Sequence, residues 1–264
     1  MNVDKFILFG DSITQYSNEV VDGFALQPEL QNAYVRRLDI LNRGFSGYNS
    51  EHARLILPKV LESELNESKD NIKLMTIFFG TNDGFIDNNP IQPVELSRYK
   101  ENIAYLVGLA LENNIKPIVI GPSLHDYKLG AENFEELKDY EAATCERYWH
   151  YSEGAKSVCQ KLNVPFIDLW DEFRKDSGWT REQLFGFRKD SPDSEVNSLS
   201  DYLNDGIHFT PKAYKILHKA IVKCIEENYP EYLPQNLPYN LAYWGDIDPT
   251  DLNSIFKEQK SLHL

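Results

Sequence analysis

The sequence predicts an α/β protein with a flavodoxin-like, doubly wound, parallel five-stranded sheet and helices on both faces. Short apolar runs alternate with longer helical patterns along the 264 residues. The short runs are continuously apolar, as expected for parallel strands that are covered on both faces. Right-handed crossovers between such strands build a sheet of this kind, with ligands bound beyond the carboxyl ends of the strands.

The elements follow one another in a regular order. Strands are predicted at 6–9, 38–41, 74–79, 117–121 and 165–170, and helices at roughly 26–37, 51–65, 94–113, 132–162 and 211–228. The helix predicted over 132–162 is long enough to be broken. The final helix is well marked, because Thr210 can cap it and Pro211 occupies a first-turn position that tolerates a missing N–H.

Two segments fall outside this alternation. Residues 171–204 are polar and contain Gly, Pro and Ser, which suits either a surface insertion or a flap over the site. Residues 229–264 mix proline with aromatic residues and suit an arm that lies on its own body or on a partner subunit. We therefore expect one domain over 1–228, followed by a C-terminal arm, with a homodimer as one of the two arrangements.

Composition excludes several classes of protein. A net charge of −14 and a pI near 4.9 argue against nucleic acid and anionic membranes, and no apolar run is long enough for membrane insertion. The three cysteines, Cys145, Cys159 and Cys224, lack zinc-ligand spacing, so we expect buried free thiols and no metal. We expect a cytoplasmic protein without a secretory signal. The peroxisome is an alternative, although Leu262 makes the end "KSLHL" only loosely similar to its signal.

Three candidate site residues come directly after predicted strands. Ser12 follows the first strand in Gly10-Asp11-Ser12, where the glycine permits a sharp turn. After the second strand, within "NRGFSGYNS", Gly44 would let a backbone N–H approach a ligand. After the third strand, in "GTNDG", Asn82 could present its amide N–H₂. Each of the three also has a purely structural explanation as a turn or cap residue.

A fourth candidate stands just before the final helix, in "NDGIHFTPKAY". A turn at Gly206 would let the Asp205 carboxylate accept a hydrogen bond from one imidazole nitrogen of His208 while the other nitrogen faces a serine. A capping aspartate and a structural histidine are the plain alternatives, and a metal site would need further ligands. Together the four segments supply a nucleophile, a general base, its orienting carboxylate and oxyanion donors.

This ordered set resembles the SGNH, or GDSL, hydrolase superfamily. Its four blocks match Ser12, Gly44, Asn82 and the D-x-x-H pair Asp205 and His208, which span most of the chain. Ile13 replaces the leucine of the family name. The strings "KFILFGDSIT", "DILNRGFSGY", "TIFFGTND" and "DGIHFTPKAYKI" are most similar to those of fungal isoamyl acetate-hydrolysing esterases.

The resemblance implies a serine esterase that acts on small-molecule, short-chain esters such as isoamyl acetate through an acyl-enzyme, without a cofactor. The triad would be Ser12, Asp205 and His208, and the oxyanion donors Ser12, Gly44 and Asn82. Independently of the resemblance, Phe24, Tyr48 and Phe85 lie near the blocks in sequence. They could form a narrow apolar substrate pocket that favours short chains, with a purely structural role in the core as the alternative.

Several alternatives remain open. An acyltransferase, a lysophospholipase or a carbohydrate acetylesterase would use the same triad. A non-catalytic binding protein could retain the same fold. A dinucleotide-dependent dehydrogenase is disfavoured, because no G-x-G-x-x-G follows a predicted strand.

Overall fold

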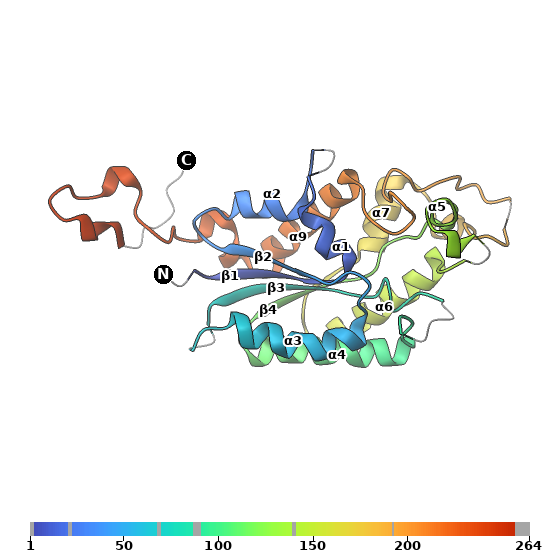
Figure 1. Ribbon diagram of the computed structural model, residues 1–264, viewed down its shortest axis with the longest axis horizontal. Coiled ribbons are helices and arrows are strands. Elements are labelled where there is room, and N and C mark those ends of the chain that lie inside the picture. The colour runs from blue at the N-terminus through green and yellow to red at the C-terminus, as the bar shows by residue number, and fades with distance from the viewer. Residues whose placement is uncertain are drawn as a thin grey trace.

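The computed structural model describes residues 3–20, 23–67, 70–86, 91–138, 141–191 and 193–256. Its centre is an all-parallel sheet of five strands in the order β2-β1-β3-β4-β5 (Figure 1). The strands are β1 (Lys5–Gly10), β2 (Asp39–Gly44), β3 (Ile72–Phe78), β4 (Lys116–Ile120) and β5 (Phe166–Ile167). The predicted fold class is confirmed, and the strand order reverses at β1, where such sheets bind ligands.

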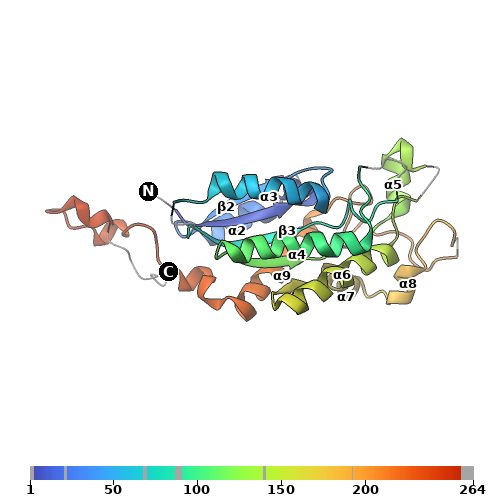
Figure 2. The same ribbon diagram turned by 90° about the horizontal axis from the view of Figure 1, so that it is seen from below.

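Helices cover both faces of the sheet (Figures 1 and 2). One face carries α1 (Ser12–Gln15), α2 (Leu26–Ala33), α7 (Leu169–Ser177) and α9 (Pro211–Asn228). The other face carries α3 (Ser50–Glu64), α4 (Leu96–Glu112) and α6 (Cys145–Leu162). The short helices α5 (Tyr127–Asn133) and α8 (Arg181–Phe185) lie toward the end of the molecule where the strands finish.

Successive side chains of β1 point into different cores, which explains its uninterrupted apolar run. Phe6 and Leu8 join the core that α2 and α9 complete, whereas Ile7 and Phe9 join the core that α3 and α4 complete. Alternate residues of a strand face opposite sides of the sheet, so a strand covered on both sides needs apolar residues at every position.

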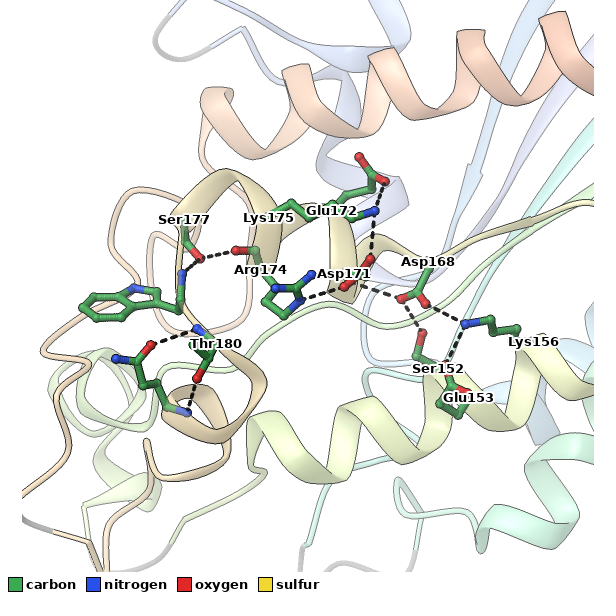
Figure 3. A network of polar contacts seen from close by, with 12 residues as sticks. Ser152, Glu153, Lys156, Asp168, Asp171, Glu172, Arg174, Lys175, Ser177 and Thr180 are labelled. Carbon is green, nitrogen blue, oxygen red and sulfur yellow. Dashed lines mark hydrogen bonds and ion pairs between the residues drawn. The ribbon is translucent and has the colours of Figure 1, made fainter.

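Capping side chains fix several helix starts. Thr210 accepts a hydrogen bond from the N–H of Ala213 at 3.3 Å, and Pro211 is the first residue of α9, as predicted. Asp168 caps α7 by accepting from the N–H of Asp171 at 3.1 Å. The same carboxylate also accepts from Ser152 and pairs with Lys156 of α6, so this group joins the two helices (Figure 3).

Several predicted elements need correction. β2 extends to Gly44, three residues past its predicted end. The helix predicted over 132–162 is broken, as its length allowed: α5 ends at Asn133 and α6 begins only at Cys145, where Thr144 caps it. The fifth strand is shorter than predicted, since Asp168 already caps the next helix. The helix predicted over 26–37 ends at Ala33.

The segment 171–204 contributes to the core as well as to the surface. It contains most of α7 and all of α8. Of its described side chains, seven are buried: Phe173, Leu184, Phe187, Val196, Leu199, Tyr202 and Leu203. These side chains anchor the segment to the body, although its charged residues stay at the surface. Movement of this segment as a flap stays a prediction.

The C-terminal arm begins against the body and then leaves it. Tyr34 donates its hydroxyl to the carbonyl of Tyr232 at 2.8 Å, and the Tyr239 ring packs against the Arg36 and Arg37 guanidinium groups. Figure 1 shows the following residues standing off the end of the molecule where the strands begin, far from their carboxyl ends. Trp244 is exposed there, and the homodimer stays a prediction. The "KSLHL" end lies outside the described residues.

Candidate active site

Ser12 stands at the carboxyl end of β1, as the first residue of α1. Asp11 caps this short helix by accepting from the N–H of Ile13 at 2.9 Å. Gly10 is required at the turn, because a Cβ there would lie 2.7 Å from the carbonyl oxygen of Phe78 and 2.1 Å from the Thr14 hydroxyl. The chain therefore leaves the strand tightly and holds the serine at the edge of the sheet, where the N–H groups of a first helical turn have no helical partner.

The structure brings Ser12, His208 and Asp205 together, although 196 positions separate the serine from the histidine. Nε2 of His208 lies 2.9 Å from Oγ of Ser12, and Nδ1 of His208 lies 2.6 Å from Oδ2 of Asp205. The other carboxylate oxygen, Oδ1, accepts from the backbone N–H groups of Ile207 and His208 at 3.0 and 2.8 Å. Both oxygens of Asp205 are thus committed to the loop that presents the histidine.

These contacts determine the tautomer of His208. An ionised carboxylate can only accept, so the proton of the neutral imidazole sits on Nδ1 and Nε2 is left to accept from the Ser12 hydroxyl. Burial alone would raise the pKa of the Asp205 carboxyl, but the hydrogen bonds from the His208 side chain and backbone lower it below its ordinary value. The arrangement has the geometry of a serine nucleophile, a general base and an orienting carboxylate.

Asn82 is positioned at the end of the β3 segment by two contacts of its loop. Its Nδ2 donates to the carbonyl oxygen of Tyr48 at 2.8 Å, which leaves the second amide hydrogen for another acceptor. The next residue, Asp83, is fully buried and accepts from both the N–H and the hydroxyl of Ser50. Burial raises the pKa of Asp83 to about 7. The loops after β2 and β3 are therefore locked to each other.

Gly44, predicted from the sequence to supply an oxyanion donor, lies outside the pocket. It is the last residue of β2, pairs with Gly10, and donates its N–H to Oδ1 of Asn42 at 2.9 Å. A Cβ at this position would lie 2.0 Å from the backbone nitrogen of Gln15, so the glycine is needed for close packing against α1. Its physical role is structural.

Gly47, and not Gly44, occupies the position expected of a glycine whose N–H faces the reacting carbonyl. It lies in the turn that the Tyr48 N–H closes on the Phe45 carbonyl at 3.1 Å, and its φ of 78° is the left-handed conformation that favours glycine. Gly47 lines the same pocket as Ser12 and Asn82. Within the described part of the chain, no residue accepts a hydrogen bond from its N–H.

A pocket of about 230 Å³ opens over the nucleophile, and we call it the serine pocket. Its lining comprises Ser12, Ser46, Gly47, Asn82, Phe85, Gln92, Phe134, Leu137, Ile207 and His208. Its apolar side belongs to a small cluster in which Phe85, Leu137 and Ile207 pack together with Ala142 and Phe134. Part of this wall comes from the stretch between α5 and α6 that the predicted long helix would have occupied.

The three predicted pocket residues separate in the structure. Phe85 lines the serine pocket. Phe24 lines a different pocket, to which His208 also contributes. Tyr48 lines neither, because its ring stacks on Phe45 with centroids 5.6 Å apart and its contribution is the carbonyl that holds Asn82. Phe134, Leu137 and Ile207 were missed, and only the position of Ile207 beside His208 offered a signal in the sequence.

Buried polar groups lie behind the site. Among the described residues, Oδ2 of Asp11, Oγ1 of Thr81, the Tyr148 hydroxyl and both ring nitrogens of His125 have no hydrogen-bond partner in the protein. Burial raises the pKa of Asp11 to about 7 and lowers the pKa of His125 to about 4. The ring of His125 packs edge-on against Phe85, which lines the serine pocket, and against Tyr148.

The described residues also limit other kinds of site. No three His, Cys, Asp or Glu side chains in that part of the chain are grouped as a metal ion would require. No helix within the described ranges is long and apolar enough to cross a membrane. All three cysteines are buried and free, as predicted.

Comparison with known proteins identifies the class. Residues 8–216 match the GDSL-like Lipase/Acylhydrolase family. The isoamyl acetate-hydrolyzing esterase of Saccharomyces cerevisiae is 37% identical over 258 residues, covering 94% of this chain and 96% of that protein. The human isoamyl acetate-hydrolyzing esterase 1 homolog is 31% identical over 252 residues, covering 92% of this chain and 88% of that protein.

Solved structures agree on the fold. An acetylxylan esterase from Geobacillus stearothermophilus superposes with a TM-score of 0.59 at 15% identity, over 85% of this chain and 96% of that one. The chain belongs to the GDSL-like lipase/acylhydrolase family. It is a carboxylic ester hydrolase with the α/β fold of the SGNH enzymes.

Proposed function

We propose that the protein is a serine esterase that hydrolyses short-chain carboxylic esters, of which isoamyl acetate is an example, through an acyl-enzyme on Ser12. The observation that carries the proposal is the continuous chain of contacts from Oγ of Ser12 to Nε2 of His208, at 2.9 Å, and from Nδ1 to Asp205, at 2.6 Å. The relatives named for isoamyl acetate hydrolysis support the choice of ester.

In the acylation step, His208 Nε2 takes the proton of the Ser12 hydroxyl while Oγ attacks the ester carbonyl carbon. The π electrons of the carbonyl move to its oxygen, where the N–H groups of Ser12 and Gly47 and the free amide hydrogen of Asn82 stabilise the negative charge. When the intermediate collapses, the bond to the alkoxy oxygen breaks. That oxygen takes the proton from His208 Nε2, and the alcohol leaves.

Deacylation repeats these steps with water. His208 removes a proton from the water as its oxygen attacks the acyl carbon, and the same donors hold the second oxyanion. Collapse breaks the bond to Ser12 Oγ, which recovers its proton from His208 Nε2, and the carboxylic acid is released. Throughout the cycle, the Asp205 carboxylate keeps the ring oriented and stabilises the imidazolium.

The serine pocket favours small acyl groups. At about 230 Å³ it is smaller than the roughly 300–1,000 Å³ typical of pockets for drug-sized ligands. Phe85, Phe134 and Leu137 close its apolar side. A long acyl chain would need an open apolar groove, and a sugar ester would need more polar walls. These features support a short-chain ester over a lysophospholipid or an acetylated carbohydrate.

Hydrolysis of p-nitrophenyl acetate, butyrate and octanoate by wild type and Ser12→Ala tests the proposal. We expect turnover that depends on Ser12 and falls as the acyl chain lengthens. Turnover that rises toward octanoate would contradict the short-chain assignment while leaving the serine mechanism intact. Equal turnover by the two proteins would contradict the mechanism itself. Adding excess alcohol and measuring ester formation distinguishes hydrolysis from acyl transfer.

A further inference from the structure

A second pocket also has His208 in its lining and is otherwise lined by different residues from the serine pocket. It has a volume of about 260 Å³, and we call it the tyrosine pocket. It is lined by Tyr16, Glu19, Phe24, Asn204, His208, Phe209, Pro211 and Tyr214. Among the described lining residues, the two pockets share His208. A ligand group in the tyrosine pocket can therefore reach the residue that moves the proton.

Tyr16 completes the partition between the two pockets. Its ring packs edge-on against the His208 ring, with centroids 5.2 Å apart and an interplanar angle of 71°. Its hydroxyl lies 3.5 Å from Oγ of Ser46, which lines the serine pocket. A substrate that reacts at Ser12 and also reaches the tyrosine pocket must pass along the edge formed by Tyr16 and His208.

The walls of the tyrosine pocket are mainly aromatic and firmly held. Phe209 and Tyr214 are buried, and the Tyr214 hydroxyl donates to the carbonyl of Ile13 at 2.7 Å, so its polar end is already occupied. Phe24 packs edge-on against His218 of α9 with ring centroids 5.8 Å apart. Among the lining residues that the structure describes, Glu19 carries a formal charge and is exposed. Lys215 lies outside the lining, with Nζ 5.7 Å from the Phe24 ring centroid. Such a pocket suits a neutral apolar group.

We propose that the tyrosine pocket binds the alkyl group of the leaving alcohol, and that Phe24 determines which alcohol is accepted. This inference rests on the proposed function. The oxyanion donors lie in the serine pocket, which fixes the carbonyl carbon there. The alkoxy oxygen must meet Nε2 of His208 to be protonated, so the alkyl group extends from the histidine side of the reacting carbon. The preferred substrates are then esters of neutral, apolar alcohols.

The test measures the hydrolysis of two series of esters by each of two variants. One series keeps the acetyl group and compares ethyl, isoamyl and benzyl acetates. The other keeps the ethyl group and compares ethyl acetate, butyrate and hexanoate. Phe24→Ala alters the tyrosine pocket, and Leu137→Ala is the matched change in the serine pocket. Thermal melts check that both variants fold. If Phe24→Ala does not fold, Phe24→Leu is used in its place.

We expect Phe24→Ala to change the ratio of kcat/KM between benzyl and ethyl acetate by roughly 10-fold, with the ratio between ethyl butyrate and ethyl acetate unchanged. Leu137→Ala should change the ratio between ethyl butyrate and ethyl acetate by a similar factor and leave the ratio between benzyl and ethyl acetate unchanged. Inhibition by isoamyl alcohol gives an independent readout, because its inhibition constant should rise in Phe24→Ala and stay unchanged in Leu137→Ala.

The outcomes separate this inference from the proposed function. If wild type hydrolyses these esters in a Ser12-dependent way but Phe24→Ala leaves the alcohol ratio unchanged, the alcohol site is wrong and the esterase stands. An acyl ratio that changes in Phe24→Ala would also overturn the inference, because it would place the acyl group in the tyrosine pocket. Absence of Ser12-dependent turnover on every ester would overturn both.

Discussion

The polar and apolar sides of the serine pocket are held in different ways. On the polar side, directed contacts fix each group: Asp205 orients His208 at 2.6 Å, and the Tyr48 carbonyl holds Asn82 at 2.8 Å. On the apolar side, Phe85 and Leu137 belong to a small cluster held by side-chain packing. Directed contacts set the reaction geometry, whereas packing sets the shape of the space. Changes on the polar side should therefore act on kcat, and changes on the apolar side should act on the choice of ester.

Ser12→Ala should have the largest effect. Loss of the nucleophile should lower kcat on the order of 10⁶-fold, as removal of a nucleophile does in a serine hydrolase. The substitution removes one hydroxyl, so the melting temperature should change little. Steady-state hydrolysis of p-nitrophenyl acetate, with a thermal melt of the same preparation, measures both quantities. Unchanged turnover by a folded variant would remove Ser12 from the mechanism.

Asp205→Asn comes next, with an expected loss of kcat on the order of 10⁴-fold, because an amide can stabilise the wrong tautomer of His208. Hydrogen bonds from His208 keep the pKa of the Asp205 carboxyl below its ordinary value of 3.8. The carboxylate is therefore already ionised above that pH, and the wild-type profile of kcat/KM should show no step from Asp205 there. An acidic step that disappears in Asp205→Asn would contradict this account.

Asn82→Ala should lower kcat by about 10²- to 10³-fold, the usual cost of one oxyanion donor. Asn71 provides a matched control at the other end of the sheet. It is also buried, and its Nδ2 also donates to a backbone carbonyl at 2.8 Å, that of Glu64. Asn71→Ala should lower the melting temperature and leave kcat unchanged. If Asn82→Ala changed only KM, the amide would bind the ground state instead.

Gly44, at the end of β2, and Gly47, in the loop that follows, should separate stability from turnover. An alanine at position 44 would place its Cβ 2.4 Å from the Cα of Gln15, so Gly44→Ala should destabilise the fold by about 1–3 kcal/mol or more. A Cβ at Gly47 would lie 3.8 Å from Nε2 of Gln92, an ordinary contact, but the φ of 78° disfavours alanine. Gly47→Ala should therefore strain the turn, displace the N–H and lower kcat by up to about 10²-fold. Denaturant unfolding and kcat are measured for both. Equal effects on turnover would restore Gly44 as a donor.

The smallest effect should come from the apolar side. Leu137→Ala should raise kcat/KM for butyrate relative to acetate by roughly 10-fold, because it lengthens the space for the acyl chain. Leu233 is similarly buried, where the start of the C-terminal arm packs into the core, so Leu233→Ala is the control for general loosening of the fold. A change of chain-length preference in the control as well would show that overall flexibility, and not the wall, sets the preference.

Most of the polar side could be predicted from the sequence. Ser12, Asn82, Asp205 and His208 lie in short segments whose turns and caps form between neighbouring residues. Ser12 and Asn82 follow strands, and Asp205 and His208 precede the last α-helix. The oxyanion role predicted for Gly44 does not fit the structure, because β2 continues to this residue, three positions beyond the predicted end of the strand. Asn42 and Arg43 are polar, and an edge strand tolerates such residues, so the apolar pattern ended too early.

The apolar side could not be predicted in the same way. Phe134 and Leu137 come from a stretch whose composition resembles that of the helices around it, and the capping role of Thr144 was the one local sign of a break. Their neighbours in the wall, Phe85 and Ile207, lie far away in the sequence. Such a wall is formed by packing between segments that lie far apart in the sequence, so no short-range sequence pattern predicts it.

The most direct test of the central claim is covalent labelling with a serine-reactive fluorophosphonate. The account predicts a single adduct by intact mass, mapped to the peptide that contains Ser12 and absent from Ser12→Ala. In His208→Ala the labelling rate should fall by about 10²-fold or more, because the general base is lost. Wild type that stays unlabelled, or a Ser12→Ala variant labelled at the same rate, would contradict the account.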